Sequence, residues 1–316
     1  MADFFHILSF AFSVTGPIFV ILALGIILAH MGILTEPFIE AGSRLVFNVT
    51  LPALLFITIS KTNIDQFANF SLIGYGLVAT LIMFLVLEWC SGFCVQPAED
   101  RGVVVQGAFR SNMGIVGLAY CANAYGDIGL AAASIYLGPV TILFNVLAVI
   151  TLNRSLNKHR SVAGAFIDIA RNPLILGILL AIPVAWMHLK LPAILLQTGE
   201  YFAQMTLPLA LLCTGASLSL KALREDSRNA MIASSGKLLI VPFIITLGGY
   251  WLGFRDMDLG ILFLMTSSPT AAASYIMVRA MKGNAVLAAN IIALTTFGSI
   301  LVASIGIALL RHLGLM

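Results

Sequence analysis

The segment GAFRSNMGI, residues 107–115, places an arginine and an asparagine between two long apolar runs. A parallel segment, MTSSPTA, occupies residues 265–271 and places hydroxyl side chains and a proline within a second apolar region. Polar groups at membrane depth cost free energy unless they are paired or line a cavity. We therefore interpret the two segments as related polar interruptions of two membrane spans.

The composition of the whole chain is that of a membrane protein. Of its 316 residues, 60% are hydrophobic and 10% are charged, and the mean hydropathy is +1.02. Soluble domains carry about 25% charged residues, so this composition excludes a soluble protein. The net charge of +3 is small and the basic residues are dispersed, which argues against nucleic-acid binding. The four cysteines form no CxxC pair, and we expect neither a metal nor a cofactor.

Hydrophobic runs predict an all-α polytopic membrane protein with ten transmembrane helices. A run of about 20 apolar residues crosses a bilayer. Turn and charge signals separate the runs, and the first has no basic segment before it, so we expect a retained span rather than a signal peptide. The predicted spans cover residues 10–29, 44–60, 71–91, 103–124, 129–151, 172–188, 200–219, 230–252, 259–279 and 286–309.

Short matching segments predict that the ten spans form two repeats. Thr50-Leu51-Pro52 recurs as Thr206-Leu207-Pro208, at an offset of 156 residues, and two further matches have offsets of 156 and 157. A repeat of five spans is odd, so its second copy inserts upside down, as in many secondary transporters. The predicted division is a first repeat at 1–153, a cytoplasmic linker at 154–171 and an inverted second repeat at 172–316.

The distribution of basic residues predicts the orientation in the membrane. If the N-terminus faces outside, the inner loops hold 11 lysines and arginines and the outer segments hold 4. The positive-inside rule favours this arrangement. We therefore expect a multi-pass protein of the bacterial inner membrane with both termini outside.

The two interruptions predict a binding site for a carboxylate. Pro269 disfavours helix at the residue before it, and glycines after Arg110 permit a break. If spans four and nine both break near the bilayer midplane, each second half begins with free N–H groups and a positive dipole end, which favour an anion. The candidate substrate-binding residues at the two breaks are Arg110, Ser111, Asn112, Ser268, Pro269 and Thr270.

Other polar residues within the spans have two interpretations each. Arg110 either contacts the substrate or is balanced by a structural carboxylate or by backbone carbonyls. Asn48 faces a cavity or bonds a neighbouring helix, and the same alternatives hold for Asn145 and Asn290 as support residues. Lys237 has a coupling role or extends to the cytoplasmic surface, and we favour the second interpretation.

At these residues the sequence resembles a bacterial member of the auxin efflux carrier family. The resemblance covers essentially the whole chain. It rests on Asn48 and Pro52, on GAFRSNMG at 107–114 running to NAYG at 123–126, and on SSPTA at 267–271 followed by Gly283-Asn284. It implies ten helices in two inverted repeats, crossing broken helices four and nine, and a scaffold beside a mobile transport unit. The architecture is similar to that of bile acid sodium symporters and sodium–proton antiporters.

The resemblance also implies a substrate class and two site residues. Members move organic anions, which are auxin in plants and malonate or other carboxylates in bacteria, and the plant carriers are homodimers. The crossing-site asparagine corresponds to Asn112 and the ninth-helix proline to Pro269. Plant carriers have a proline in helix four as well, and Ser111-Asn112-Met113-Gly114 lacks it. The break in span four is therefore less strongly specified than the break in span nine.

The sequence thus predicts a secondary active transporter of a small mono- or dicarboxylate that works by alternating access, with a proton or sodium as the coupling ion. One alternative is a sodium-coupled symporter of the bile acid type. Another is a membrane sensor that binds the same ligand class without transport. An enzyme is not expected, because the chain has no HExxH, GxSxG or P-loop motif and no nucleophile–base set.

Overall fold

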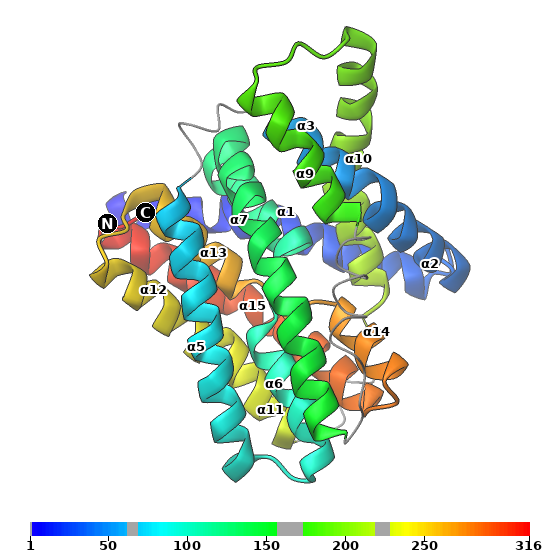
Figure 1. The fold of residues 1–316 in the computed structure, drawn as a ribbon, viewed down its shortest axis with the longest axis vertical. Helices are drawn as coiled ribbons and strands as arrows, with labels where there is room; N and C mark the ends of the chain where they lie inside the picture. Colours follow the sequence, from blue (N-terminus) through cyan, green and yellow to red (C-terminus); the bar gives the residue numbers. More distant parts are fainter. Residues whose placement is uncertain (1, 62–68, 157–172, 219–227) are drawn as a thin grey trace.

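In the residues that the structure describes, the protein is all α-helical (Figure 1). The computed structural model describes residues 2–61, 69–156, 173–218 and 228–316, and these contain no β-strand. The α-helices are α1 (Ala2–His30), α2 (Glu36–Leu45), α3 (Leu51–Ser60), α5 (Phe70–Cys94), α6 (Arg101–Phe109), α7 (Leu118–Ser155), α9 (Pro173–Trp186), α10 (Ala193–Ala216), α11 (Arg228–Ser235), α12 (Val241–Trp251), α13 (Asp256–Ser267), α14 (Ala273–Ala280) and α15 (Ala285–His312). Single turns of other helix types are η1 (Val46–Thr50), η2 (Ala98–Asp100), η3 (Met113–Gly117) and η5 (Gly236–Ile240).

Six helical stretches in the described residues are long and apolar enough to cross a membrane. They are Ser9–His30, Glu36–Ser60, Phe70–Cys94, Met113–Ser155, Arg228–Trp251 and Ala285–His312, and α9 is a shorter apolar helix. The prediction of an all-α multi-pass membrane protein is confirmed at this level. The count of ten spans in two inverted repeats stays a prediction, and most of the expected linker at 154–171 lies outside the described residues.

Asparagine side chains fix the start of two of the long helices. The Asn69 side chain accepts a hydrogen bond from Leu72 N at 3.1 Å at the start of α5, and Asn284 accepts one from Leu287 N at 3.0 Å at the start of α15. Each bond satisfies a backbone donor that has no partner within its own helix. The sequence therefore sets the first turn of both helices locally.

Two widened turns precede prolines in the middle of long helical stretches. The π-turn η1 is followed by Pro52, and the π-turn η5 is followed by Pro242. Proline has no N–H group and its ring displaces the preceding turn, which widens the helix there. The turn η5 carries Lys237, so the widening determines where this side chain points.

A sharp turn at Gly126 divides the 38-residue helix α7 into two segments. Gly126 has φ 64° and ψ −150°, a backbone conformation that glycine adopts without steric cost. The sequence places a turn at Gly126 and Asp127 between spans four and five, and the structure agrees. Residues 118–125 therefore continue the segment that begins at α6, and residues 127–155 form a separate segment.

The helices pack as two groups with α1 beside both (Figure 1). One group contains α2, α3, α9 and α10, at the upper right of the view, and the other contains α5, α6, α7 and α11 to α15. Helix α1 packs along α10 of the first group and α15 of the second. The guanidinium of Arg311 lies 3.8 Å from the centre of the Phe10 ring, so the first turns of α1 and the end of α15 are adjacent.

The outer surface of the molecule is apolar, as lipid contact requires. Leu179, Leu180 and Ile305 are examples of large apolar side chains that are more than half exposed. Trp89, Trp186 and Trp251 are exposed by 70%, 70% and 75% and lie near the ends of α5, α9 and α12. Tryptophans concentrate at the two membrane–water interfaces, so these positions fit a bilayer around the molecule.

Candidate functional site

The two polar segments of the sequence meet at two broken helices. Helix α6 ends at Phe109 and α13 ends at Ser267, and Ser111 and Thr270 form an isolated antiparallel bridge between the two breaks. Asn112 N donates to Pro269 O at 2.7 Å, and Ala271 N donates to Arg110 O at 3.1 Å. Each break thus supplies the backbone partners that the other lacks, which satisfies buried polar groups without water.

Two hydroxyl groups add a second reciprocal pair of hydrogen bonds. Ser111 Oγ donates to Thr266 O at 3.3 Å, and Thr270 Oγ1 donates to Gly107 O at 2.6 Å. Thr270 follows Ser111 by 159 residues, and Thr266 follows Gly107 by the same number. The sequence places Arg110 and Ser268 at matching depths, eight residues after Gly102 and Gly260, which makes them equivalent at an offset of 158 residues. The hydrogen bonds instead make Arg110 equivalent to Pro269, one position further on. Hydroxyl donors at these sites cap carbonyls that the interrupted helices leave unpaired.

The N–H groups directly at the two breaks are not free, contrary to the expectation from the sequence. Asn112 N and Ala271 N are used across the break, and Thr270 N donates to Thr295 Oγ1 at 3.1 Å. The free donors begin one or two residues later. Within the described residues no acceptor faces the N–H groups at positions 113–115 or at 272 and 273, and all of these except Met113 are partly exposed. Two short rows of donors therefore open at the starts of η3 and α14, and such donors favour a bound anion.

Arg110 lies at the end of α6 with its side chain enclosed. It is 6% exposed, its Nη2 donates to Asn145 Oδ1 at 2.6 Å, and its Nη1 lies 3.7 Å from Met277 Sδ. An amide oxygen and a thioether are both neutral, and the thioether is a weak acceptor. Asn145 thus takes the support position that the sequence predicts for it, and the charge of Arg110 is left without a carboxylate among the described residues.

Gln106 is a site residue that the sequence reasoning missed. It lies four residues before Arg110 on α6, is fully buried, and donates from Nε2 to Met277 Sδ at 3.6 Å. Among the described residues, its Oε1 has no hydrogen-bond partner, and neither has the buried Ser274 Oγ on α14. Because residues four apart share a helical face, the spacing from Arg110 was the signal that could have found it. The two orphaned oxygens are acceptors available to a bound molecule.

Lys237 differs most from its expected position. We favoured an amine that extends to the cytoplasmic surface, and this interpretation is wrong because the side chain is 0% exposed. Its Nζ donates to Ser111 Oγ at 2.6 Å and to the Thr266 carbonyl oxygen. Lys237 therefore belongs to the contact between the two breaks, next to the carbonyl end of α13, where a helix dipole favours a cation.

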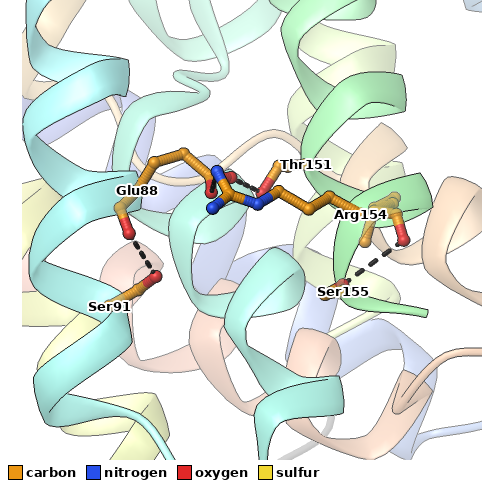
Figure 2. Close-up of polar contacts among 6 residues, drawn as sticks. Glu88, Ser91, Thr151, Arg154 and Ser155 are labelled. Carbon is orange, nitrogen blue, oxygen red and sulfur yellow. Dashed lines mark hydrogen bonds and ion pairs between the residues drawn. The ribbon is translucent and has the colours of Figure 1, made fainter. Parts of the chain in front are cut away.

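The buried and half-buried carboxylates among the described residues bond to groups outside the site between the breaks. Glu88 on α5 accepts hydrogen bonds from Thr151 and Arg154 on α7, beside a cavity of about 170 Å³ at the far end of α6 (Figure 2). Asp100 accepts from Asn229 and Asn284, each at 3.1 Å. None of these acids contacts Arg110 or Lys237. The site between the breaks therefore holds two enclosed basic side chains and no described acid.

The remaining predicted site residues lie at different distances from this centre. Asn112 is 8% exposed and its side-chain amide makes no hydrogen bond in the described residues. Ser268 is fully buried and donates to Met265 O of its own helix at 2.8 Å. Asn290 is buried in α15, next to Ile291, which packs against Gly107. A side chain at Gly107 would place its Cβ 2.8 Å from Ile291 Cγ2, so α6 and α15 require glycine here.

Asn48 is not part of the cluster. Its side chain is exposed and its Nδ2 donates to Arg44 O of the same helical stretch at 2.8 Å. This bond differs from both alternatives in the sequence interpretation, a cavity and a neighbouring helix. The described residues also contain no group of three or more His, Cys, Asp or Glu side chains placed to hold a metal.

Comparison with known proteins gives one consistent result. The family model described as "Membrane transport protein" matches residues 11–162 and 159–307. An uncharacterized transporter of Methanothermobacter thermautotrophicus is 25% identical over 257 residues, 80% of this chain and 83% of its own. One from Methanocaldococcus jannaschii is 24% identical over 86% of this chain and 89% of its own, and the uncharacterized transporter YfdV of Escherichia coli is 26% identical over 81% and 83%. The two matches cover nearly the whole chain, so the chain belongs to this family of membrane transport proteins, which includes the auxin efflux carriers, and is a multi-pass membrane transporter.

Proposed function

We propose that the protein is a secondary active transporter of a small organic anion, a mono- or dicarboxylate of the malonate or auxin type. The observation that carries this proposal is the pair of enclosed basic side chains, Arg110 and Lys237, with no described carboxylate beside them. A cation buried without a counter-ion is costly, and a bound anion removes most of that cost. The site is therefore matched to a ligand that brings negative charge.

The proposed binding mode uses groups of three kinds. One carboxylate oxygen pairs with the Arg110 guanidinium, which keeps its Nε and one Nη without an oxygen partner. The free N–H groups at the starts of η3 and α14 hold the other oxygen. The Asn112 amide and the orphaned oxygens of Gln106 and Ser274 then select among organic parts by hydrogen bonding.

The proposed architecture is ten spans in two inverted repeats with helices four and nine crossing at the breaks. The two reciprocal pairs of hydrogen bonds support it, because one shift of 159 residues and an exchange of partners converts each bond into its counterpart. A two-fold axis in the membrane plane would produce this relation. In this arrangement both breaks lie near the bilayer midplane and both termini face outside.

The proposed transport cycle moves the helix group that carries the breaks against the group of α2, α3, α9 and α10. Helix α10, which belongs to the group of α2, α3, α9 and α10, touches η3, so the contact between the groups passes beside the site. Sliding along this contact would expose the anion site to one side of the inner membrane and then to the other. In a homodimer whose interface is formed by α2, α3, α9 and α10, this group would stay in place while the other group moves.

Ligand binding and exchange test the proposal together. Purified protein is screened with malonate and other carboxylates by thermal shift, and exchange of radiolabelled malonate is measured in proteoliposomes. Arg110→Gln should weaken malonate binding by about 30-fold or more, since losing one partner of a buried charge pair costs about 2–5 kcal/mol. Asn112→Ala should weaken binding by about tenfold with an unchanged Tm, because its amide makes no internal bond.

The matched control is Arg279→Gln, which removes an exposed arginine on α14 and should leave binding unchanged. Full malonate binding by Arg110→Gln would refute the assignment of the anion site. A carboxylate that stabilises the protein but never exchanges across the vesicle membrane would identify a sensor, and uptake that depends on sodium at fixed pH would identify a sodium symporter.

A further inference from the structure

Lys237 is enclosed at the point where the two broken helices touch. Its amine donates to Ser111 Oγ at 2.6 Å and to the Thr266 carbonyl, and the side chain is 0% exposed. A hydroxyl and a carbonyl orient an ammonium group but carry no net charge. The positive charge is therefore balanced only by something that binds nearby, or is removed when the amine loses a proton.

The charged and titratable groups on the elements packed against η5 do not supply that balance. Arg110 directly precedes Ser111 in the chain, and it is itself a cation. Asp258 on α13 lies eight residues from Thr266, about 12 Å along the helix, and pairs with Asn69. The others lie near helix ends or in the far ion pair: Arg101 on α6, Arg228 on α11, Tyr250 on α12, Asp256 on α13, Arg311 and His312 on α15, and Glu88, Cys90 and Cys94 on α5. The Tyr75 hydroxyl on α5 donates to Ile245 O on α12.

Arginine and lysine respond differently to such a position. A guanidinium stays protonated in proteins, whereas an amine can exist in charged and neutral forms. Arg110 therefore gives the site a permanent positive charge, and Lys237 gives it a charge that can be switched. A neutral amine still donates to Thr266 O or Ser111 Oγ, so the contact between the breaks survives loss of the proton.

We propose that Lys237 carries the coupling proton, so that the protein transports its organic anion together with a proton. This inference rests on the proposed function, because it needs an anion that binds beside Arg110. When Lys237 is protonated, the site holds two positive charges and binds the anion. When the anion leaves on the other side, the proton leaves too, and the empty site returns with the charge of Arg110 alone.

The Ser111 hydroxyl provides the path for the proton. Lys237 Nζ donates to Ser111 Oγ, and Ser111 is 5% exposed while Lys237 is fully enclosed. A proton that leaves Nζ passes to Ser111 Oγ as the hydroxyl turns away from Thr266 O and releases its own proton to water that reaches the site when it opens. The reverse sequence reloads the amine, so no charge is left on the serine.

The test measures proton-driven accumulation of radiolabelled malonate in proteoliposomes whose membrane potential is clamped at zero. With one proton per anion, an outside pH one unit more acidic should drive about tenfold accumulation, since one pH unit and a tenfold gradient are equivalent in free energy. A pH-sensitive dye inside the vesicles should report acidification when malonate is added. Exchange of labelled for unlabelled malonate, which needs no driving force, is measured in parallel.

Lys237→Arg separates coupling from binding. The arginine keeps a positive charge that cannot be switched, so malonate exchange should persist while accumulation driven by the pH gradient falls from about tenfold to none. Lys237→Gln should lose the pH-driven accumulation and also bind malonate more weakly. The matched control is Lys190→Arg, an exposed lysine that makes no contact with the breaks, and it should behave as the unchanged protein.

Each result is decisive for one of the two claims. If the unchanged protein neither binds nor exchanges any carboxylate of the screen, the proposed function fails. If it exchanges malonate but shows no dye response, or if Lys237→Arg accumulates malonate fully, the proton role of Lys237 is overturned while the anion site stands. The dye response of the unchanged protein decides whether a proton moves with malonate even if both Lys237 variants fail to fold.

Discussion

At the break between α6 and η3 the chain carries a charged residue, Arg110, and no proline; at the break between α13 and α14 it carries Pro269 and no charge. The two breaks nevertheless form matching hydrogen bonds, two from backbone N–H groups and two from hydroxyls. The geometry of an interrupted helix is thus held by the partner break rather than by a proline of its own. In the proposed function, the first break supplies the charge that binds the anion, and the second break supplies the stiffening proline together with the N–H groups at the start of α14.

The two breaks also differ in what supports them from outside. Thr295 on α15 accepts from Thr270 N, so the second break is fixed by a neutral hydroxyl. The first break has Lys237, whose amine reaches Ser111 and the end of α13 together. Charge is therefore concentrated on one side of an otherwise symmetrical contact. In the proposed function, this asymmetry places the response to the charge of the anion at the first break.

The largest effect on malonate affinity is expected from a variant in which a neighbouring side chain neutralises the charge of Arg110. Asn145→Asp places a carboxylate where Asn145 Oδ1 now lies 2.6 Å from Arg110 Nη2. A substrate would then have to displace an internal ion pair, a cost of about 2–5 kcal/mol, so malonate affinity should fall by about 100-fold. Isothermal titration of the purified variant with malonate measures this change.

Stability distinguishes this effect from damage to the fold. The new ion pair should leave the Tm of Asn145→Asp equal to or above that of the unchanged protein, since a buried cation gains a partner. Asn145→Ala is the control, because it removes the hydrogen bond without adding a charge, and its affinity should fall by less than about tenfold. Malonate binding by Asn145→Asp at full strength would show that Arg110 is not the anion's partner.

The next prediction removes the same hydrogen bond from each break. Thr270→Val deletes the bond to Gly107 O and leaves a buried carbonyl without a partner, which should lower the free energy of unfolding by about 1–3 kcal/mol. Ser111→Ala deletes its bond to Thr266 O and also an acceptor of the Lys237 ammonium, for about 1.5–3 kcal/mol more. Denaturation in mild detergent, followed by circular dichroism, compares the two variants.

A hydroxyl outside the contact between the two breaks provides the reference for the variants Ser111→Ala and Thr270→Val. Thr214 on α10 makes no side-chain hydrogen bond among the described residues, and Thr214→Val should change stability by less than about 0.5 kcal/mol. Equal losses for Ser111→Ala and Thr270→Val would mean that Lys237 contributes nothing to the first break. The two breaks would then differ in their amino-acid sequence but not in the stability that their hydrogen bonds provide.

How far the sequence predicts this site depends on the kind of signal each residue gives. The two interruptions stand out, because Arg110 and Pro269 are costly within apolar runs. Asn145 was expected as support without a named partner, since the distance between segments 35 residues apart is not encoded in either segment. The register of the pairing was off by one position, because matches of a few residues do not resolve a shift of a single residue within a break.

Gln106 was missed, and the position of the Lys237 side chain was predicted wrongly, for different physical reasons. Gln106 lies in a run of small and apolar residues, and an uncharged amide gives little signal by itself. Lys237 gave a signal that pointed the wrong way, since a lysine seven residues into a span commonly extends to the surface. The widened turn before Pro242 was the missing information, because a π-turn redirects side chains that a regular helix would place elsewhere.

A smaller effect is expected from the neutral support of the second break. Thr295→Val leaves the Thr270 N–H without an acceptor, and the free energy of unfolding should fall by about 1 kcal/mol. Malonate affinity should change by less than about twofold, because no charge is involved. The control is Thr296→Val, whose hydroxyl bonds only Ile292 O of its own helix. A large loss of affinity in Thr295→Val would show that anion binding depends on the position of the second break as strongly as on the charge of the first.

The smallest effect on stability and malonate affinity is expected at Asn48. This asparagine lies outside the breaks, whereas Asn112 lies between them. The Asn48 amide donates to Arg44 O in its own helical stretch and its side chain is exposed. Asn48→Ala should change stability by less than about 0.5 kcal/mol and leave malonate affinity unchanged, because neither break loses a partner. Titration with malonate beside Asn112→Ala provides the measurement. If Asn48→Ala weakens binding as much as Asn112→Ala, the anion must also contact the helix group of α2 and α3. Both helix groups would then bind the anion. Contacts between the anion and the α2 and α3 group would have to break and re-form as the two groups move.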